Sequence, residues 1–591
     1  MVHIVPYWDF NDGQMIDVQV FSNCPEIELF AQWDDAESSD RTSLGKFTLD
    51  HSHGNSLHGS WRLPYKKGTL TAVAYDFDGR IAATDTQRSF GDPAKIVLSP
   101  DKTTLTADGE DMIFIEVSTI DDRGTFVANA RNRMNVTVTG AARLVGMDNG
   151  DSTDYEEYKG ISRRLFSGRL LLLLAAKKTP GPIDVTVESP GLPGATLSLQ
   201  AVSPEGSVSE GVCASGEVVP RITDEAILSE IPARKISLRV VSGAPCNDGV
   251  YTLSPDCKTA LIEATVLPVD ATLTDITFRA LTKDGIDSAA VTLTLQEDGH
   301  SVLLTALGDE PDYMLYAFAN NNKTVEDVIS SLTFTNIGLG KATVDPYTFV
   351  NAIRADDSSA PVKLSFDGGV FSADEPSRVH FTHVDFGDYG SDRITIPIFS
   401  FSDTVPIEIW EGIPGPSGTL LFRGNYEAKS WYNHYQPNTF RLAKRLRGVT
   451  SISILVPFRL SLHGFVFERI DKAWAEIGVT ELLHASGDAY NITEDGIYGI
   501  SNNVDLAFGT FDFGERGART ITVTGRSHAP QCTIHLHFTK DGAAETQIID
   551  IPKTDEVETF TFALDPVHGA CAVNFIFLPG TDFDLLSFRF E

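Results

Sequence analysis

Hydrophobic and polar residues alternate over short stretches along the whole chain. In residues 16–20, Ile16, Val18 and Val20 fall on one side of an extended backbone, and Asp17 and Gln19 fall on the other. A period of two is expected for a β-strand with one buried face. The same alternation recurs at residues 113–117, 236–240, 291–295, 394–398 and 534–538. The pattern predicts an all-β chain.

Turn signals divide these alternating stretches. Asp-Gly pairs, which favour tight hairpin turns, occur at residues 78–79, 108–109, 284–285, 298–299 and 541–542. Helical periodicity is best over residues 471–483, a segment that falls where a linker is expected. Many short strands with frequent turns predict tandem β-sandwiches of ~100 residues each.

The chain has 591 residues, more than one hydrophobic core accommodates. Proline, glycine and serine gather near four places, which predict the domain boundaries. We expect five domains, at residues 1–90, 91–204, 205–345, 346–477 and 478–591.

The last two predicted domains resemble each other in sequence. HVDFGDYG at residues 383–390 and TFDFGERG at 510–517 share an Asp-Phe-Gly core, and each is followed by an alternating stretch. The segments at 462–467 and 583–588 also correspond. Repetition of a whole domain predicts a duplicated binding or packing unit.

The first 195 residues resemble a known family. HIVPYWDFNDGQMIDVQVFSN at residues 3–23 resembles the sandwich that follows the catalytic barrel in family 2 glycoside hydrolases of the β-galactosidase type, and the ELF at 28–30 matches the next strand. The acidic loop at 31–43 is longer than in the family. Residues 88–124 and 140–192 are similar to the immunoglobulin-like domain that comes next, with DNGD and RRLFSGRLL as its marks.

The remaining residues resemble binding modules. Residues 205–345 are similar to a bacterial immunoglobulin-like domain, and 346–591 resemble two copies of carbohydrate-binding module family six. The resemblance implies tandem immunoglobulin-like β-sandwiches followed by two jelly-roll β-sandwich modules.

The sequence offers no catalytic site for glycoside hydrolysis. A retaining glycosidase needs two carboxylates ~5 Å apart, and in family 2 the acid/base glutamate follows an asparagine. No Asn-Glu pair occurs in the chain, and no alternation of strands and helices predicts a barrel. The resemblance therefore implies that the catalytic residues lie on another stretch of polypeptide, with this chain either a fragment of a longer protein or a separate subunit.

Aromatic residues in the first copy are the leading candidates for carbohydrate binding. Trp431, Tyr432 and Tyr435 lie in one loop. An exposed indole packs on the apolar face of a sugar while polar groups bind its hydroxyls. In the family six modules, a loop tryptophan at about the place of Trp431 stacks on sugar. The alternative is that these rings pack between domains. Trp410 is either a second platform or a half-buried aromatic of the sandwich.

In the second copy, the candidate binding residues are Tyr498 and Asp582. The resemblance places Tyr498 in the loop that often carries the other stacking ring, with Asn502 and Asn503 beside it. It also implies that Asp582 replaces the asparagine ligand near the closing strand, where the first copy has Ser461. Both departures weaken the resemblance at the sugar cleft.

No metal or other cofactor is predicted. The oxygen-rich segment 148–154 lacks the closing glutamate of a calcium loop, which favours a series of Asx turns. His535 and His537 share a strand face but have no third ligand for zinc. The cysteines at 24, 213, 246, 257, 532 and 571 have no metal-binding spacing and are expected to be free, with a Cys532–Cys571 pair as the alternative.

The charge of the chain limits its partners. With 81 acidic and 47 basic residues the formal charge is −34, which disfavours nucleic acid and anionic membranes. The longest apolar run, at 170–176, is too short to span a membrane, and the first residues show no signal peptide, so a cytoplasmic location is expected. The expected partners are a glycan and the catalytic barrel, as a domain or a subunit, and a homo-oligomer is possible. The alternatives are a stand-alone glycan-binding or adhesive protein, or a purely structural one.

Overall fold

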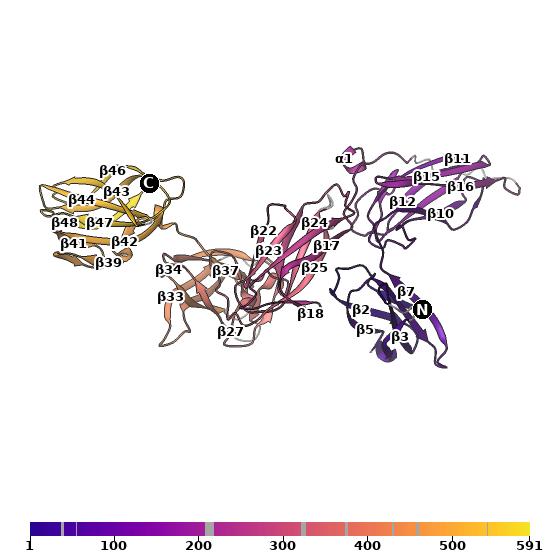
Figure 1. Cartoon of the computed structure of the whole chain (residues 1–591), viewed down its shortest axis with the longest axis horizontal. Helices are drawn as coiled ribbons and strands as arrows, with labels where there is room; N and C mark the ends of the chain where they lie inside the picture. Colours follow the sequence, from indigo (N-terminus) through magenta and orange to yellow (C-terminus); the bar gives the residue numbers. More distant parts are fainter. Residues whose placement is uncertain are drawn as a thin grey trace. The chain divides into compact units, whose positions relative to one another are not determined.

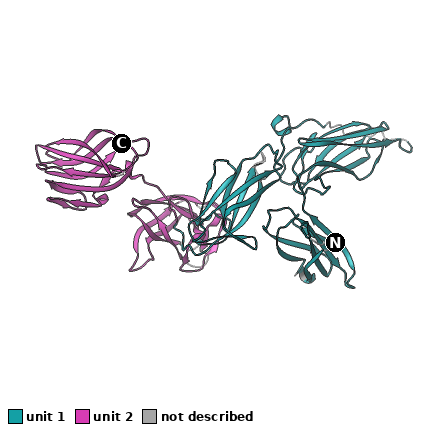
Figure 2. Cartoon of the chain, in the orientation of Figure 1, with its two compact units in different colours: residues 1–343 teal, residues 344–591 magenta. Residues whose placement is uncertain are grey.

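The computed structural model describes residues 1–36, 41–54, 56–206, 218–320, 327–372, 376–427, 429, 431–456, 460–540 and 542–591. Strands make up 59% of the chain and helices 3%, which confirms the predicted all-β class. The chain divides into two compact units, residues 1–343 and 344–591 (Figures 1 and 2).

The first unit begins with a sandwich of two sheets. One has the order β1 (Val2–Val5), β2 (Met15–Ser22), β5 (His58–Pro64), and the other β4 (Thr42–Thr48), β3 (Glu26–Trp33), β6 (Gly68–Tyr75), β7 (Ile81–Arg88). A 3-10 turn, η1 (Ser52–Gly54), precedes β5. The alternation in β2 places Ile16, Val18 and Val20 in the core, as the sequence pattern predicts.

A second sandwich follows in the same unit. Its sheets are β12 (Ala142–Asp148), β14 (Arg169–Ala176), β10 (Met112–Ile120), β8 (Lys95–Pro100), and β13 (Ser162–Arg164), β11 (Arg133–Gly140), β15 (Gly181–Ser189), β16 (Leu192–Val202), β9 (Thr104–Thr106). Its core is separate from that of the first sandwich, which makes each a packing unit of its own.

The third sandwich completes the first unit. Its sheets are β17 (Lys235–Gly243), β20 (Thr259–Leu267), β23 (Ser301–Ala306), β22 (Val291–Leu295), and β18 (Cys246–Asn247), β19 (Val250–Leu253), β25 (Asp327–Asn336), β24 (Glu310–Asn320), β21 (Ile276–Leu281). Before it lies α1 (Glu225–Leu228), a single turn capped by the side chain of Asp224 and the one α-helix in the described residues.

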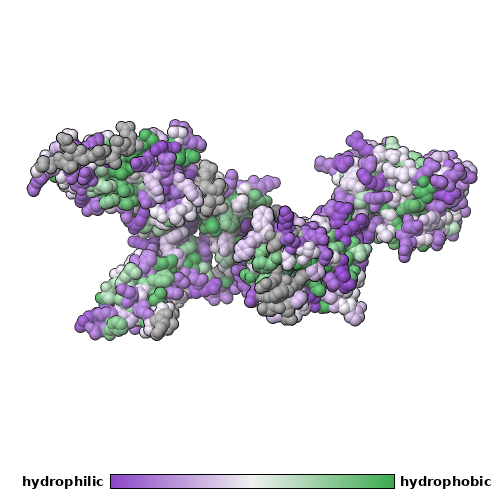
Figure 3. All heavy atoms as spheres, turned by 180° about the vertical axis from the view of Figure 1, so that it is seen from behind, coloured by the Kyte–Doolittle hydropathy of each residue, from purple (hydrophilic) through white to green (hydrophobic). Residues whose placement is uncertain are grey.

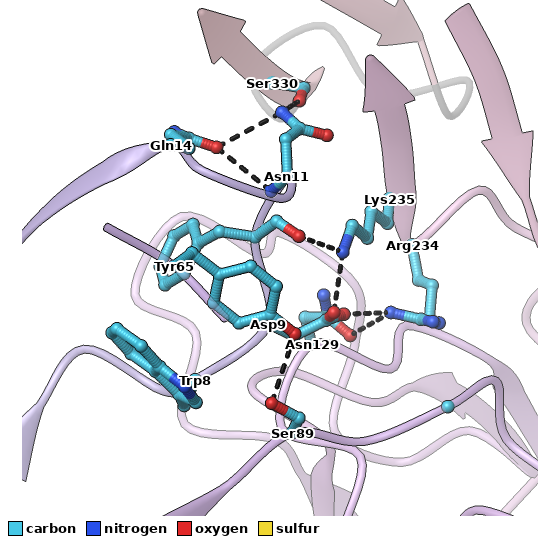
Figure 4. A network of polar contacts seen from close by, with 12 residues as sticks. Trp8, Asp9, Asn11, Gln14, Tyr65, Ser89, Asn129, Arg234, Lys235 and Ser330 are labelled. Carbon is cyan, nitrogen blue, oxygen red and sulfur yellow. Dashed lines mark hydrogen bonds and ion pairs between the residues drawn. The ribbon is translucent and has the colours of Figure 1, made fainter. Parts of the chain in front are cut away.

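A buried polar network joins the three sandwiches of this unit (Figure 4). The Asp9 carboxylate accepts from Arg234 Nη1 at 2.7 Å and from Lys235 Nζ at 2.6 Å. Arg234 also donates through Nε to Asp92 at 2.5 Å, which brings in the second sandwich. The side chains of Asp9 and Arg234 are only 5% and 4% exposed. The charges thus compensate each other at a junction that is largely buried.

The neighbouring residues of the same segment strengthen this junction. Asn11 donates through Nδ2 to Ser330 Oγ at 2.7 Å, and its Oδ1 accepts from the Leu238 backbone at 2.8 Å. Trp8 is fully buried in the first sandwich, where its Nε1 donates to the Lys66 carbonyl at 2.9 Å. The His-x-x-Pro-x-Trp motif therefore leads directly into a segment that fastens one sandwich to the others.

The second unit begins with a sandwich that we call the first repeat. One sheet is β26 (Val350–Asn351), β37 (Gly464–Phe467), β31 (Ser391–Ser400), β36 (Leu460–Leu462), β29 (Val370–Ser372), β28 (Lys363–Leu364), with β34 (Gln436–Leu446) also on β31; the other is β27 (Asp357–Ser358), β30 (Ser377–Asp385), β35 (Val449–Val456), β32 (Thr404–Glu411), β33 (Thr419–Glu427). Two 3-10 turns, η2 (Ala352–Arg354) and η3 (Phe366–Gly368), lie in its connections.

The second repeat has the corresponding sheets. One is β40 (Ala489–Ile492), β41 (Ile497–Ser501), β48 (Phe583–Phe590), β43 (Ala518–Ser527), β46 (Glu558–Val567), with β38 (Ile477–Gly478) on β48; the other is β39 (His484–Ser486), β42 (Val504–Asp512), β47 (Ala570–Phe577), β44 (Gln531–Lys540), β45 (Ala543–Pro552).

Strand register relates the two repeats residue by residue. Val350 pairs with Phe465 in the first repeat, and Ile477 pairs with Phe588 in the second. Likewise Ile394 pairs with Phe467, and Ile521 pairs with Phe590. The sequence similarity between the two segments therefore reflects one sandwich built twice.

The helical periodicity over residues 471–483 does not produce an α-helix. The segment forms η4 (Lys472–Trp474) and η5 (Val479–Glu481), with β38 between them. Pairing of Ile477 with Phe588 recruits the middle of the segment into a sheet, and this long-range contact overrides the local pattern.

Hydrophilic residues predominate on the face of the chain that Figure 3 shows, and hydrophobic residues form separate areas there. None of the helices in the described part of the chain has the length and apolar character needed to span a bilayer.

Candidate functional site

The ten sheets of the described residues are open sheets facing each other in sandwiches, and none is a closed ring of parallel strands. Only two strand pairs, β9–β16 and β19–β25, are parallel within them. A barrel that could place two catalytic carboxylates is therefore not formed by these residues.

A strip of neighbouring rings lies on the outer face of one sheet in the first repeat. Ile394, Ile396 and Ile398 of β31 point into the core, so Phe399 at the strand end lies on the opposite face of the strand, where it is buried. Other rings lie around it, and the ring centroids of each contacting pair are between 4.3 and 6.3 Å apart. We call these residues the aromatic strip: Phe349, Phe366, Phe399, Phe401, Tyr432, Tyr435 and His463.

Tyr435 anchors the strip. Its hydroxyl lies 2.9 Å from Ser461 Oγ and 3.2 Å from both Ser365 Oγ and the Phe366 carbonyl, and its ring stacks on His463 at 4.3 Å. A side chain at Gly369 would come within 2.2 Å of the Tyr435 hydroxyl, so this close approach needs glycine. Tyr435 therefore supports the strip from below rather than offering a free ring.

The most exposed rings of this region are Trp431, Tyr432 and Phe401, with 62%, 74% and 52% of their surface open to solvent. Tyr432 meets Phe399 edge-on at 5.9 Å, and Trp431 lies 4.3 Å from the His434 ring. Burial lowers the pKa of His463, which stacks on Tyr435, and this favours its neutral form. Flat apolar surfaces next to hydroxyl groups, without a fixed charge among the strip's side chains, suit a neutral sugar ring.

Trp410 is held in place on the opposite sheet of the first repeat. It lies on the outer face of β32, opposite Ser453 of β35, and its Nε1 donates to Glu408 at 3.0 Å. This hydrogen bond, followed by Arg423, lowers the pKa of the Glu408 carboxyl. The half-buried indole belongs to this polar arrangement and lies on the other sheet from the aromatic strip.

In the second repeat, Tyr498 donates to Asp495 at 3.1 Å, and Asn502 and Asn503 form a tight turn with positive φ angles of 47° and 54°. Asn502 Oδ1 also accepts from the Gly580 backbone, so Asn502 has a structural role. Asp582 is exposed and contributes its carbonyl to the backbone N–H of His528.

The strand register identifies a different counterpart of Ser461. Ser461 pairs with Phe399, and the corresponding pair of the second repeat is Asp584 with Arg526. Asp584, two residues after Asp582, therefore occupies the equivalent position. Sequence alone missed Asp584, Arg526 and the neighbouring His528, because only the pairing of β43 with β48 brings them together.

The segment at 148–154 forms successive Asx turns, in which Asp148, Asp151 and Asp154 each accept from the backbone N–H two residues on. Asp154 also pairs with Arg163 at 3.2 Å. The rings of His535 and His537 are 6.4 Å apart. No group of three or more metal-ligating side chains occurs within the described residues.

Cys532 and Cys571 are free thiols in the core of the second repeat, so the alternative of a disulfide between them is wrong. Cys213 lies outside the described residues. Burial raises the pKa of Cys532 to about 12 and that of Cys571 to about 11.

Alkylation should therefore discriminate among the cysteines. At mildly alkaline pH we expect iodoacetamide to modify the exposed Cys246 first and to leave Cys532 and Cys571 intact until the chain unfolds. Peptide mass spectrometry over time measures this order. Early modification of either buried thiol would show that the core of the second repeat opens readily.

Two family models match the first unit. One is the glycoside hydrolase family 2 C-terminal domain 5, over residues 96–198, and the other is a domain of unknown function, over residues 13–83. Both matches lie within the first two sandwiches.

Known proteins are similar over about a third of the chain. The β-galactosidase BoGH2A of Bacteroides ovatus is 32% identical over 202 residues, which are 34% of this chain and 22% of that protein. A β-glucuronidase of Formosa agariphila is 28% identical over 224 residues, 34% of this chain and 21% of that protein. A β-glycosidase structure from Bacteroides vulgatus is 29% identical, with a TM-score of 0.31, and covers 34% of this chain and 24% of that one.

The chain is thus related over part of its length to family 2 glycoside hydrolases, and it spans about a fifth of the length of these curated relatives.

Proposed function

We propose that this chain is the non-catalytic, carbohydrate-binding part of a family 2 glycoside hydrolase of the β-galactosidase type. The family matches in the first unit and the sandwich architecture support the accessory role. The observation that carries the binding role is a group of exposed rings: Tyr432 and Phe401, which both contact Phe399 of the aromatic strip, and Trp431, which precedes Tyr432 in the chain. The catalytic barrel is either continuous with this chain in a longer protein or a separate subunit.

A sugar at this site would place its apolar face on the exposed rings. Tyr432 and Phe401 both contact Phe399, so the two rings share one support. Ser365 and the buried Ser461 bond to each other and to the Tyr435 hydroxyl, so they hold the support of the strip in place. The ligand that fits this combination is a neutral oligosaccharide.

Removing the exposed rings should weaken binding. We expect Trp431→Ala and Tyr432→Ala each to raise the Kd for neutral β-galacto-oligosaccharides by roughly tenfold, the effect of losing an aromatic anchor of about 1.4 kcal/mol. Isothermal titration calorimetry measures this. Tyr155→Ala is the matched control, because Tyr155 is a 94% exposed ring in the first unit. Equal Kd values for wild type and both variants would show that these rings are not the binding site.

The accessory role has its own test. Mixing the full chain with a separately produced family 2 barrel should give a complex, seen by light scattering, and should increase hydrolysis of a chromogenic galactoside. The alternative, a stand-alone adhesive protein, would bind glycan and form no complex with the barrel. Deletion of residues 346–591 tests a purely structural role, which requires the oligomeric state to change.

A further inference from the structure

The equivalent positions of the two repeats carry different chemistry. In the first repeat, Phe399 pairs with Ser461, and Phe401 follows two residues later. In the second, Arg526 pairs with Asp584, and His528 follows two residues later. The place that holds rings in one copy therefore holds a guanidinium, an imidazole and a carboxylate in the other.

The carboxylate of this second site is fixed by two donors. Asp584 Oδ1 accepts from the Gly499 backbone at 2.9 Å, and its Oδ2 lies 2.8 Å from His528 Nε2. The Asp584 side chain is 13% exposed and that of His528 is 35% exposed. Tyr498, which precedes Gly499 on β41, adds an aromatic ring near the same strand end.

Arg526 has no side-chain hydrogen bond or ion pair with another described residue. It is half-buried and directly opposite Asp584, yet that carboxylate is engaged by Gly499 and His528. Its Nε is buried and has no hydrogen-bond acceptor among the described residues. Buried donors are normally satisfied. Because this Nε is closed to solvent, an incoming acceptor would have to reach the part of the half-buried guanidinium that stays open.

We propose that the second repeat binds an acidic sugar, with the Arg526 guanidinium paired to the sugar carboxylate. The proposal rests on the proposed function, in which the repeats bind glycans. The planar guanidinium matches a carboxylate with two parallel hydrogen bonds. His528 and Asp584 lie beside it as partners for sugar hydroxyls, and Tyr498 offers a ring face.

The overall charge limits the kind of acidic ligand. A formal charge of −34 repels anions at long range, so recognition has to come from the short contact with Arg526. A single uronic acid residue in a glycan meets this condition better than a densely charged polyanion.

The test compares two sugars that differ only at C6, methyl β-glucuronide and methyl β-glucoside, on the full chain. Titration calorimetry should give a Kd for the glucuronide at least about tenfold lower than for the glucoside, as expected for a charge-assisted pair. Arg526→Gln should abolish this preference, and Arg526→Lys should retain part of it. Equal affinity for the two sugars, or an unchanged preference in Arg526→Gln, would overturn the inference.

Two further measurements separate this inference from the proposed function. Trp431→Ala should leave glucuronide binding unchanged while it weakens binding of neutral oligosaccharides. If the wild-type chain shows no preference for the glucuronide but binds neutral oligosaccharides through Trp431, only the acidic site is refuted. Absence of binding to any of these sugars refutes both. Thermal unfolding of Arg526→Gln at the wild-type midpoint verifies that the variant is folded.

Discussion

Replacing Asp9 with asparagine should destabilise the first unit by roughly 3–5 kcal/mol, the cost of removing one partner from a buried ion pair. The substitution keeps the shape of the side chain but leaves Arg234 and Lys235, 4% and 15% exposed, without their shared carboxylate. Burial already lowers the pKa of Lys235, so this amine can lose its proton, whereas the guanidinium stays charged. Differential scanning calorimetry of the full chain measures the change.

The location of the effect identifies its cause. The transition of the first unit should move to lower temperature while that of residues 344–591 stays in place. Asp78→Asn is the matched control, because Asp78 and Arg80 form an ion pair with side chains 71% and 79% exposed, and such pairs contribute little. A small shift for Asp9→Asn, similar to the control, would show that the Asp9 network contributes little to the stability of the first unit.

The second large effect is expected at Glu481, which connects the two repeats of the second unit. Its carboxylate, 4% exposed, pairs with Arg445 at 2.7 Å and also with Arg447. Arg445 in turn lies over the Tyr389 ring at 4.0 Å. Glu481→Gln should cost up to about 3 kcal/mol, somewhat less than Asp9→Asn, because the two arginines are partly open to water.

Hydrogen exchange of the full chain localises this second effect. Faster exchange is expected in η5 and in the end of β34, where Arg445 lies, and the core strands of both repeats should be unaffected. Glu468→Gln serves as the control, since Glu468 and Arg393 form an exposed pair with side chains 54% and 51% open. Unchanged exchange in Glu481→Gln would mean that the repeats are held together by other contacts.

Local patterns predict the strands well but not the long-range contacts. The alternation at Ile394, Ile396 and Ile398 gives both the strand and its buried face, because side-chain direction in a strand depends only on sequence position. The Asp-Phe-Gly motif occurs in both repeats, so the duplication is also visible in the sequence alone. The segment 471–483 shows the limit, since its pairing with β48 depends on residues about a hundred positions later.

The candidate sites differ in how far the sequence predicts them. Trp431 and Tyr432 are exposed in a loop with no periodic neighbours, whereas the sequence left open whether the loop aromatics bind sugar or pack between domains. The anchoring role of Tyr435 depends on Ser365 and Ser461, which come from distant segments. His528 and Asp584 are 56 residues apart, and only the register of β43 against β48 places them in contact.

The central claim is that this chain binds neutral glycans without cleaving them. Isothermal titration of the purified full chain with β-galacto-oligosaccharides, followed by chromatography of the sugar, tests both parts at once. We predict saturable heat that decreases in Trp431→Ala, and sugar recovered intact. Heat that continues at a steady rate with shortened products, or no binding heat at all, would contradict it.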